Sequence, residues 1–189
     1  MKEPDGDKKE MLDRNLLEEQ LCELPLYEYH FIDVRQLTFT QRIRDICRTE
    51  CPMYGKSWAC PPGTGTVEEC RQRCMAYDKA LLIATVTEVR DIADIQETLD
   101  TRADHEEVTR QAADLVKSQT GNVFVLSSEA CAECESCAYP NEPCRFPERM
   151  NPCIESHGIL LTDTLEQLGI EFQYGGNVVT WFSLIFYNE

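Results

Sequence analysis

The chain has 189 residues, 42% hydrophobic and 28% charged, a composition typical of a globular protein with one domain and a core. Its 34 acidic and 18 basic residues give a formal net charge of −16, which disfavours nucleic acid and anionic membrane as partners because both attract basic surfaces. The longest apolar run, 181–187, is too short to span a bilayer, and the first residues lack a signal-peptide pattern, so we expect a cytoplasmic protein with no membrane contact.

Apolar periodicity and turn residues predict the elements of the first half of the chain. An apolar helical stripe ends at Pro25, and Thr66 with Glu69 forms the capping-box pattern that starts a helix. In chain order we expect a helix over 11–24, a strand over 26–34, a short helix over 40–47, a proline-containing loop over 49–65 and a helix over 66–77.

The second half begins with a buried apolar strand, followed by acidic amphipathic helices that end at Gly121. Asn151 and Pro152 resemble an N-cap and a first helical residue, and they predict a helix that ends at Gly169. In chain order we expect a strand over 80–86, helices over 92–117, a strand over 123–126, a cysteine-rich loop over 130–150, a helix over 151–168, and strands over 170–174 and 178–187.

This alternation of helices and strands predicts an α/β fold, with a small mixed sheet flanked by helices and two cysteine-rich metal-binding loops. We expect an N-terminal helical extension over 1–24 and a single cysteine-rich metal-binding domain over 25–189. Cys22, on the first helix, is expected to be a buried core thiol.

The eleven cysteines are the dominant feature of the sequence. Disulfides need an oxidising compartment, which no export signal supports, and the number of cysteines is odd. Bound metal therefore explains them better than disulfides do. They are Cys22, Cys47, Cys51, Cys60, Cys70, Cys74, Cys131, Cys134, Cys137, Cys144 and Cys153.

The second cysteine group contains a repeated spacing, with two residues between Cys131 and Cys134 and again between Cys134 and Cys137. One tight loop with this spacing can reach three corners of a cubane cluster, as in bacterial ferredoxins. Zinc sites more often pair two separate units of two ligands, so the run favours [4Fe–4S] over zinc. Cys144 is the preferred fourth ligand, and Cys153, in the first turn of the predicted helix, is the alternative.

The first cysteine group comprises Cys47, Cys51 and Cys60, whose irregular spacings still allow three ligands from one folded-back loop. Cys70 and Cys74 lie four residues apart on one helix face, and either supplies a fourth ligand or is a small buried hydrophobic residue.

Other residues of the first loop are candidates for the surroundings of a cluster. Tyr54 and Trp58 would shield it from water, although simple loop packing explains either residue alone. Lys56 is a candidate contact for a substrate or partner, or else a solvated lysine. The segment 42–74 has six basic and four acidic residues, a local reversal of charge that suits a negatively charged site.

Two motifs give the chain a resemblance to a known family. They are Cys51-Pro-Met-Tyr-Gly-Lys-Ser-Trp-Ala-Cys60-Pro-Pro, and Cys131-x-x-Cys134-x-x-Cys137 followed by Pro143-Cys144-Arg145-Phe-Pro147. The sequence resembles the predicted metal-binding proteins known as domain of unknown function 2284, found largely in anaerobes. The resemblance implies metal binding through the seven cysteines of the two groups, with Arg145 offsetting cluster charge. The sequence departs from the family pattern at Cys153, where a serine is usual, and at His157.

Three functions are compatible with these features. We rank first an electron-transfer protein or redox accessory of an anaerobic enzyme, with one or two [4Fe–4S] clusters and a redox partner protein, because no nucleophile–base pair is evident. An enzyme whose cluster keeps an open iron site for substrate ranks second, since only three cysteines of the first group are closely spaced. A structural zinc-binding interaction module ranks third.

Overall fold

The structure, a computed structural model, describes residues 12–189, and its centre is a four-stranded sheet of order β1-β2-β4-β3. The strands are β1 (Glu28–Asp33), β2 (Lys79–Glu88), β3 (Phe124–Leu126) and β4 (Val178–Tyr187). The α/β fold is confirmed, but every neighbouring pair of strands is antiparallel, where we expected a mixed sheet. The reason is that β4 lies between β2 and β3 and runs opposite to both, so β2 and β3 do not pair with each other, and β1 pairs antiparallel with β2.

The two long central strands are apolar on both faces. Leu82 is paired with Leu184 on one face, and Leu81 with Ile185 on the other, because successive side chains of a strand point to opposite sides. All four side chains are buried. This explains why β2 and β4 read as nearly continuous apolar runs, as is typical of strands covered on both faces.

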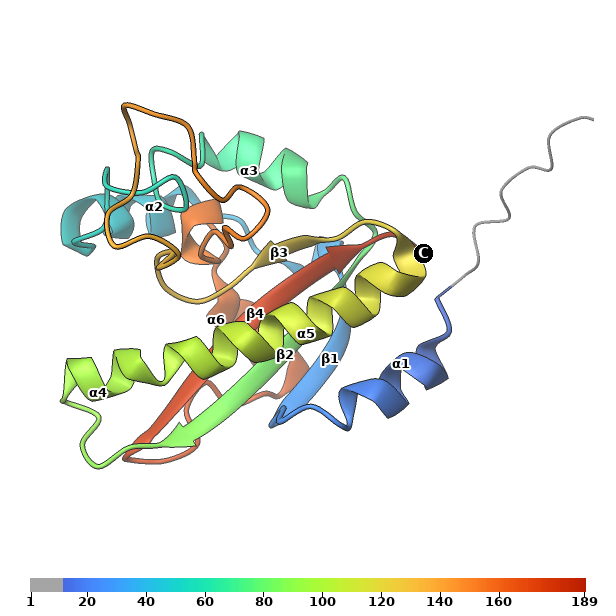
Figure 1. The fold of residues 1–189 in the computed structure, drawn as a ribbon. Coiled ribbons are helices and arrows are strands. Elements are labelled where there is room, and N and C mark those ends of the chain that lie inside the picture. Colours follow the sequence, from blue (N-terminus) through green and yellow to red (C-terminus); the bar gives the residue numbers. More distant parts are fainter. Residues whose placement is uncertain (1–11) are drawn as a thin grey trace, which may run out of the picture.

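Helices α1 (Arg14–Leu21), α4 (Ile95–Asp100) and α5 (Arg102–Thr120) lie on one side of the sheet, and Figure 1 shows α5 running across it. Leu17 and Leu21 of α1 pack with Val116 of α5 in one buried cluster that includes β2 and β4 residues. Helix α5 ends at Gly121, as predicted, where φ is +79°.

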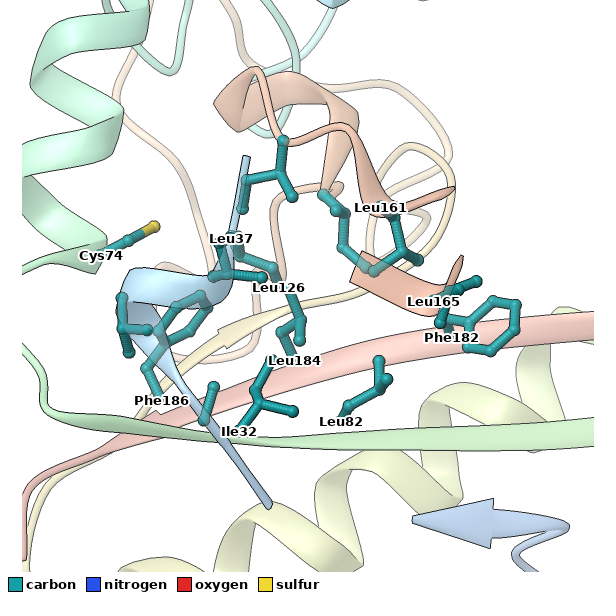
Figure 2. Close-up of a cluster of buried hydrophobic side chains, with 14 of the residues drawn as sticks. Ile32, Leu37, Cys74, Leu82, Leu126, Leu161, Leu165, Phe182, Leu184 and Phe186 are labelled. Carbon is teal, nitrogen blue, oxygen red and sulfur yellow. The ribbon is translucent and has the colours of Figure 1, made fainter. Parts of the chain in front are cut away.

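The opposite face is covered by α2 (Gln41–Glu50), α3 (Val67–Cys74), α6 (Leu161–Leu168) and the 3-10 turns η1 (Val34–Gln36) and η2 (Glu155–His157). Figure 2 shows their core, in which Leu161 and Leu165 of α6 lie above the sheet residues Leu82 and Phe182. The predicted capping box at Thr66 and Glu69 is present at the start of α3.

Two predictions in the last third of the chain were wrong. The helix expected over 151–168 is interrupted at Gly158, whose φ is +73° and where a Cβ atom would lie 3.0 Å from a Val67 methyl and 3.2 Å from the Thr40 carbonyl oxygen. The strand expected over 170–174 is absent, and side-chain contacts hold this segment instead of backbone pairing, since Phe172 stacks on Phe182 and the Tyr174 hydroxyl donates to Glu28. Within residues 12–189, no helix combines the length and apolarity needed to cross a membrane.

A buried polar network links α5 to the sheet. His105 is 1% exposed, and its two ring nitrogens lie 2.8 Å from the hydroxyl oxygens of Thr85 and Ser183. Burial lowers the pKa of His105 to about 4, because the protonated ring would lose its hydration. The folded protein therefore holds this ring neutral at pH values where the unfolded chain protonates it.

We expect Leu184→Ala to lower the free energy of unfolding by about 2–5 kcal/mol, because the side chain is fully buried between its neighbours and its removal leaves a cavity. Chemical denaturation of the purified protein measures this change. Leu16→Ala, at a side chain 45% exposed, is the control and should change stability by less than about 0.5 kcal/mol. Equal effects of the two substitutions would contradict the assigned core.

The stability of the protein should fall as the pH is lowered from about 6.5 to about 5, by roughly 1–2 kcal/mol from His105 alone. Stability falls in this direction because His105 takes up its proton at a higher pH in the unfolded state than in the folded state. The loss of stability ends below the folded-state pKa of about 4. Denaturation at several pH values measures the slope. His105→Gln should flatten it, and His30→Gln, at a partly exposed ring, should not.

Candidate metal centre

Four cysteines from separate segments line one pocket of about 400 Å3: Cys47, Cys51, Cys60 and Cys153. Cys47 lies in the last turn of α2, and Cys51 follows that helix, donating its backbone N–H to the Cys47 carbonyl over 3.2 Å. Cys60 is on the following loop and Cys153 precedes η2. The pocket thus joins the predicted first group to a cysteine far away in the sequence.

The loop that carries Cys60 turns back on itself at Gly63. A Cβ atom there would lie 2.8 Å from the Ser57 carbonyl oxygen and 3.1 Å from that of Cys60, so only glycine allows this close approach. The folded-back loop holds Cys60 at 2% exposure.

Burial and neighbouring thiols raise the pKa of Cys47 to about 11, although the nearby Arg44 guanidinium opposes the rise. The thiols of Cys60 and Cys153 hydrogen-bond to each other, which lowers the pKa of Cys60 and, together with burial, raises that of Cys153. The protonated thiol is therefore favoured at Cys47 and Cys153, whereas the shift at Cys60 favours the thiolate. A bound metal would reverse the preference for the protonated form, because it ligates the thiolate form.

Arg44 is a buried cation beside the first pocket. It is 8% exposed, and it donates to the Thr64 hydroxyl over 3.0 Å, to the Gly65 carbonyl over 2.5 Å and to the Ser156 carbonyl. Within the described residues, no carboxylate forms an ion pair with it. Its hydrogen bonds are satisfied, whereas its charge is not offset by an ionised partner.

The second pocket, of about 230 Å3, is lined by the four cysteines of the second group: Cys131, Cys134, Cys137 and Cys144. Partial burial raises the pKa of Cys131. Partial burial also acts on Cys137, but backbone hydrogen bonds, including one from Trp58, and the Ser57 hydroxyl outweigh it and lower the pKa of Cys137. The second loop thus presents one thiol that its surroundings already favour as a thiolate.

The first cysteine loop contributes residues to both pockets. Lys56 and Trp58, from the first loop, line the second pocket, and the indole N–H of Trp58 donates to the Glu142 carbonyl over 3.0 Å. The Trp58 and Tyr139 rings meet edge to face with centroids 4.8 Å apart. Figure 1 shows the two loops side by side near α2. The segment 51–60 therefore belongs to both pockets.

Other predicted site residues lie elsewhere. Cys70 and Cys74 are fully buried, and neither lines the two pockets; Cys74 belongs to the core beneath α3, and burial raises its pKa to about 12. Tyr54 is half-buried and lines neither pocket. Arg145 supports the second loop by donating to the Ser136 carbonyl over 2.8 Å.

The positions of Cys22 and Cys153 correct two sequence predictions. Cys22 is exposed at the end of α1 and is not a core thiol. His157 is fully buried, and its Nε2 lies 3.2 Å from an Arg73 nitrogen. Cys153 itself is not in the first turn of a helix. Its backbone forms an isolated β-bridge with Ser127.

Sequence reasoning missed the pairing of Cys153 with the first group, because only the tertiary fold brings η2 beside α2. No local spacing signals this contact. Within residues 12–189, no three histidine, cysteine or acidic side chains converge on one point as ligands of a single metal ion. The thiols instead surround two volumes, four around each.

No curated protein and no solved structure matches this chain. The profile of the predicted metal-binding proteins, DUF2284, matches residues 30–187, which include both cysteine pockets. Because the match spans most of the sequence and confirms the resemblance carried by the two cysteine motifs, the chain belongs to this family of predicted metal-binding proteins.

Proposed function

We propose that the protein binds two [4Fe–4S] clusters, one in each cysteine pocket, and acts in electron transfer or as a redox accessory of an enzyme. The observation that carries this proposal is the gathering of eight cysteines into two sets of four around adjacent pockets. Four cysteines are the usual ligand set of such a cluster. When bound, a [4Fe–4S] cluster accepts and releases single electrons.

The arrangement of the thiols favours a cluster over a single zinc ion at each site. Four ligands of zinc must converge on one atom at about 2.3 Å. A cubane instead offers a separate iron to each thiolate, so its ligands stand farther apart around a larger volume. Thiols that surround a pocket without converging on one point fit the second requirement better.

The buried charge of Arg44 supports an anionic occupant of the first pocket. Burying a cation without an ionised partner is costly, and the surrounding carbonyls offset only part of this cost. A cluster held by four thiolates carries net negative charge and would supply the missing partner. Arg44 is close enough to Cys47 to lower its pKa against the effect of burial.

The segment common to the two pockets supports a role in electron transfer. Segment 51–60 contributes Cys51 and Cys60 to one pocket and Lys56 and Trp58 to the other, so two clusters would lie close together. A redox partner protein is the expected source or acceptor of electrons. Cys153 gives the first pocket a fourth thiol, which favours a fully ligated cluster there over the alternative of an open iron site.

Iron, sulfide and zinc content of anaerobically purified protein tests the proposal. We expect about eight irons and eight sulfides per chain, with broad visible absorption. Cys137→Ala and Cys153→Ala should each remove about half of both, because each change deprives a different pocket of a ligand. Cys22→Ala, at an exposed thiol outside both pockets, is the control and should change neither. One or two zinc ions without sulfide would instead indicate a zinc-stabilised interaction module.

Arg44→Gln should lower the reduction potential of one cluster, because an electron added beside a buried cation is stabilised by it. Anaerobic redox titration followed by electron paramagnetic resonance measures the potential. Arg44→Lys, which keeps the charge, should restore most of it. Arg42→Gln, at an exposed position of the same helix, is the matched control. If Arg44→Gln and Arg44→Lys gave the same potential, Arg44 would have only a structural role.

A further inference from the structure

Ser57 is a buried hydroxyl residue on the first cysteine loop. It lies three residues before Cys60, is 2% exposed and lines the second pocket. A buried hydroxyl group without a hydrogen-bond partner is costly, because it has lost its hydration and gained nothing in return. The partners of this hydroxyl therefore show why a serine stands at this position.

Two backbone groups of the same loop fix the position of Ser57. The Ala59 N–H donates to the Ser57 hydroxyl oxygen over 3.1 Å, and the Cys60 N–H donates to the Ser57 carbonyl over 3.2 Å. Because the hydroxyl oxygen already accepts the bond from Ala59, its own proton is left for donation to another group. The first loop thus determines where this proton can be donated.

The acceptor of the proton is the sulfur of Cys137, on the second cysteine loop. The Ser57 hydroxyl and the Trp58 backbone N–H both hydrogen-bond to this sulfur. Cys137 lines the second pocket, whereas Cys60 lines the first. A continuous path of covalent and hydrogen bonds therefore runs from a cysteine of one pocket, through Ala59 and Ser57, to a cysteine of the other.

We propose that Ser57 is a positioning residue that raises the reduction potential of the second cluster, because its hydroxyl donates to the ligand sulfur of Cys137. This inference rests on the proposed function, since it concerns one of the two clusters. A hydrogen bond to a ligating sulfur stabilises the negative charge that a [4Fe–4S] cluster gains on reduction. The reduction moves one electron from the redox partner to the cluster, and the Ser57 proton stays on its own oxygen.

Anaerobic redox titration of Ser57→Ala, followed by electron paramagnetic resonance, tests this role. The second cluster is identified as the one whose signal disappears in Cys137→Ala. We expect Ser57→Ala to lower the equilibrium constant for reduction of the second cluster by about ten-fold, which corresponds to about 59 mV for one electron. The potential of the first cluster should stay unchanged. If the potential of the second cluster did not fall, or if both potentials fell equally, the proposal would be overturned.

Two further variants separate the hydroxyl group from the packing of the loop. Ser57→Thr keeps the hydroxyl and should restore the equilibrium constant to within about two-fold of its wild-type value. Ser118→Ala, at an exposed serine of α5 outside both pockets, is the control and should shift neither potential. A shift in Ser57→Thr as large as that in Ser57→Ala would show that the hydroxyl is not responsible.

Pulsed electron–nuclear double resonance after exchange into deuterated water detects the donated proton directly. The second cluster of the wild-type protein should show a deuterium coupling that Ser57→Ala lacks and Ser57→Thr retains. Equal deuterium couplings in the wild-type protein and Ser57→Ala would contradict the proposed hydrogen bond. If Ser57→Ala did not retain its second cluster, the absence of any exchangeable coupling in the wild-type spectrum would overturn the proposal and its presence would support it.

Iron and sulfide are measured on every sample. Wild-type protein that holds both clusters, with a second potential that does not respond to Ser57→Ala, overturns only the role of Ser57. Wild-type protein without iron and sulfide overturns the proposed function itself. The two failures are therefore distinguished by composition.

Discussion

The buried guanidinium of Arg44 is the interaction on which the first pocket depends. The Arg44 side chain extends from α2, and its guanidinium donates hydrogen bonds to the carbonyls of Gly65 and Ser156. A single side chain therefore joins the helix of Cys47, the end of the first cysteine loop and the turn after Cys153. Backbone contacts between α2 and that turn are confined to the start of the helix, where the Thr40 N–H donates to the Gly158 carbonyl and Phe39 forms a β-bridge with Ile159. The cation that supports this junction also lies where the proposed function requires positive charge.

The sheet determines where such a junction can form. Its two long strands are buried on both faces, which fixes α5 and α1 on one side and leaves the other for α2, α3, α6 and the cysteine loops. The loops therefore lie on a rigid support without belonging to it. This separation is common in proteins whose chemistry is carried by loops, because the core tolerates little change whereas the loops tolerate much.

The sequence predicted the elements that depend on local patterns. The strand at 178–187, the capping box at Thr66 and the helix end at Gly121 all follow from apolar runs or from the needs of unpaired backbone groups, and the structure confirms them. The break at Gly158 was missed because it results from contact with Val67 and Thr40, which no local pattern records.

The same limit applies to the candidate site. The close spacing of Cys131, Cys134 and Cys137 predicted that they would gather, and they do so in one pocket. Cys153 was predicted only as the alternative fourth ligand of the second group, because its proximity to Cys60 depends on how η2 packs against α2. Short-range spacing thus revealed one complete set of cysteines and only three members of the other.

The contribution of one segment to both pockets has a thermodynamic consequence. Segment 51–60 must be ordered to complete either pocket, and the Trp58 hydrogen bond to Glu142 extends that order to the second loop. Whichever site is filled first bears most of the entropy cost of fixing this segment, and the other is then filled at a smaller cost. Positive cooperativity in assembly follows from this arrangement, so damage to one site weakens the other without emptying it.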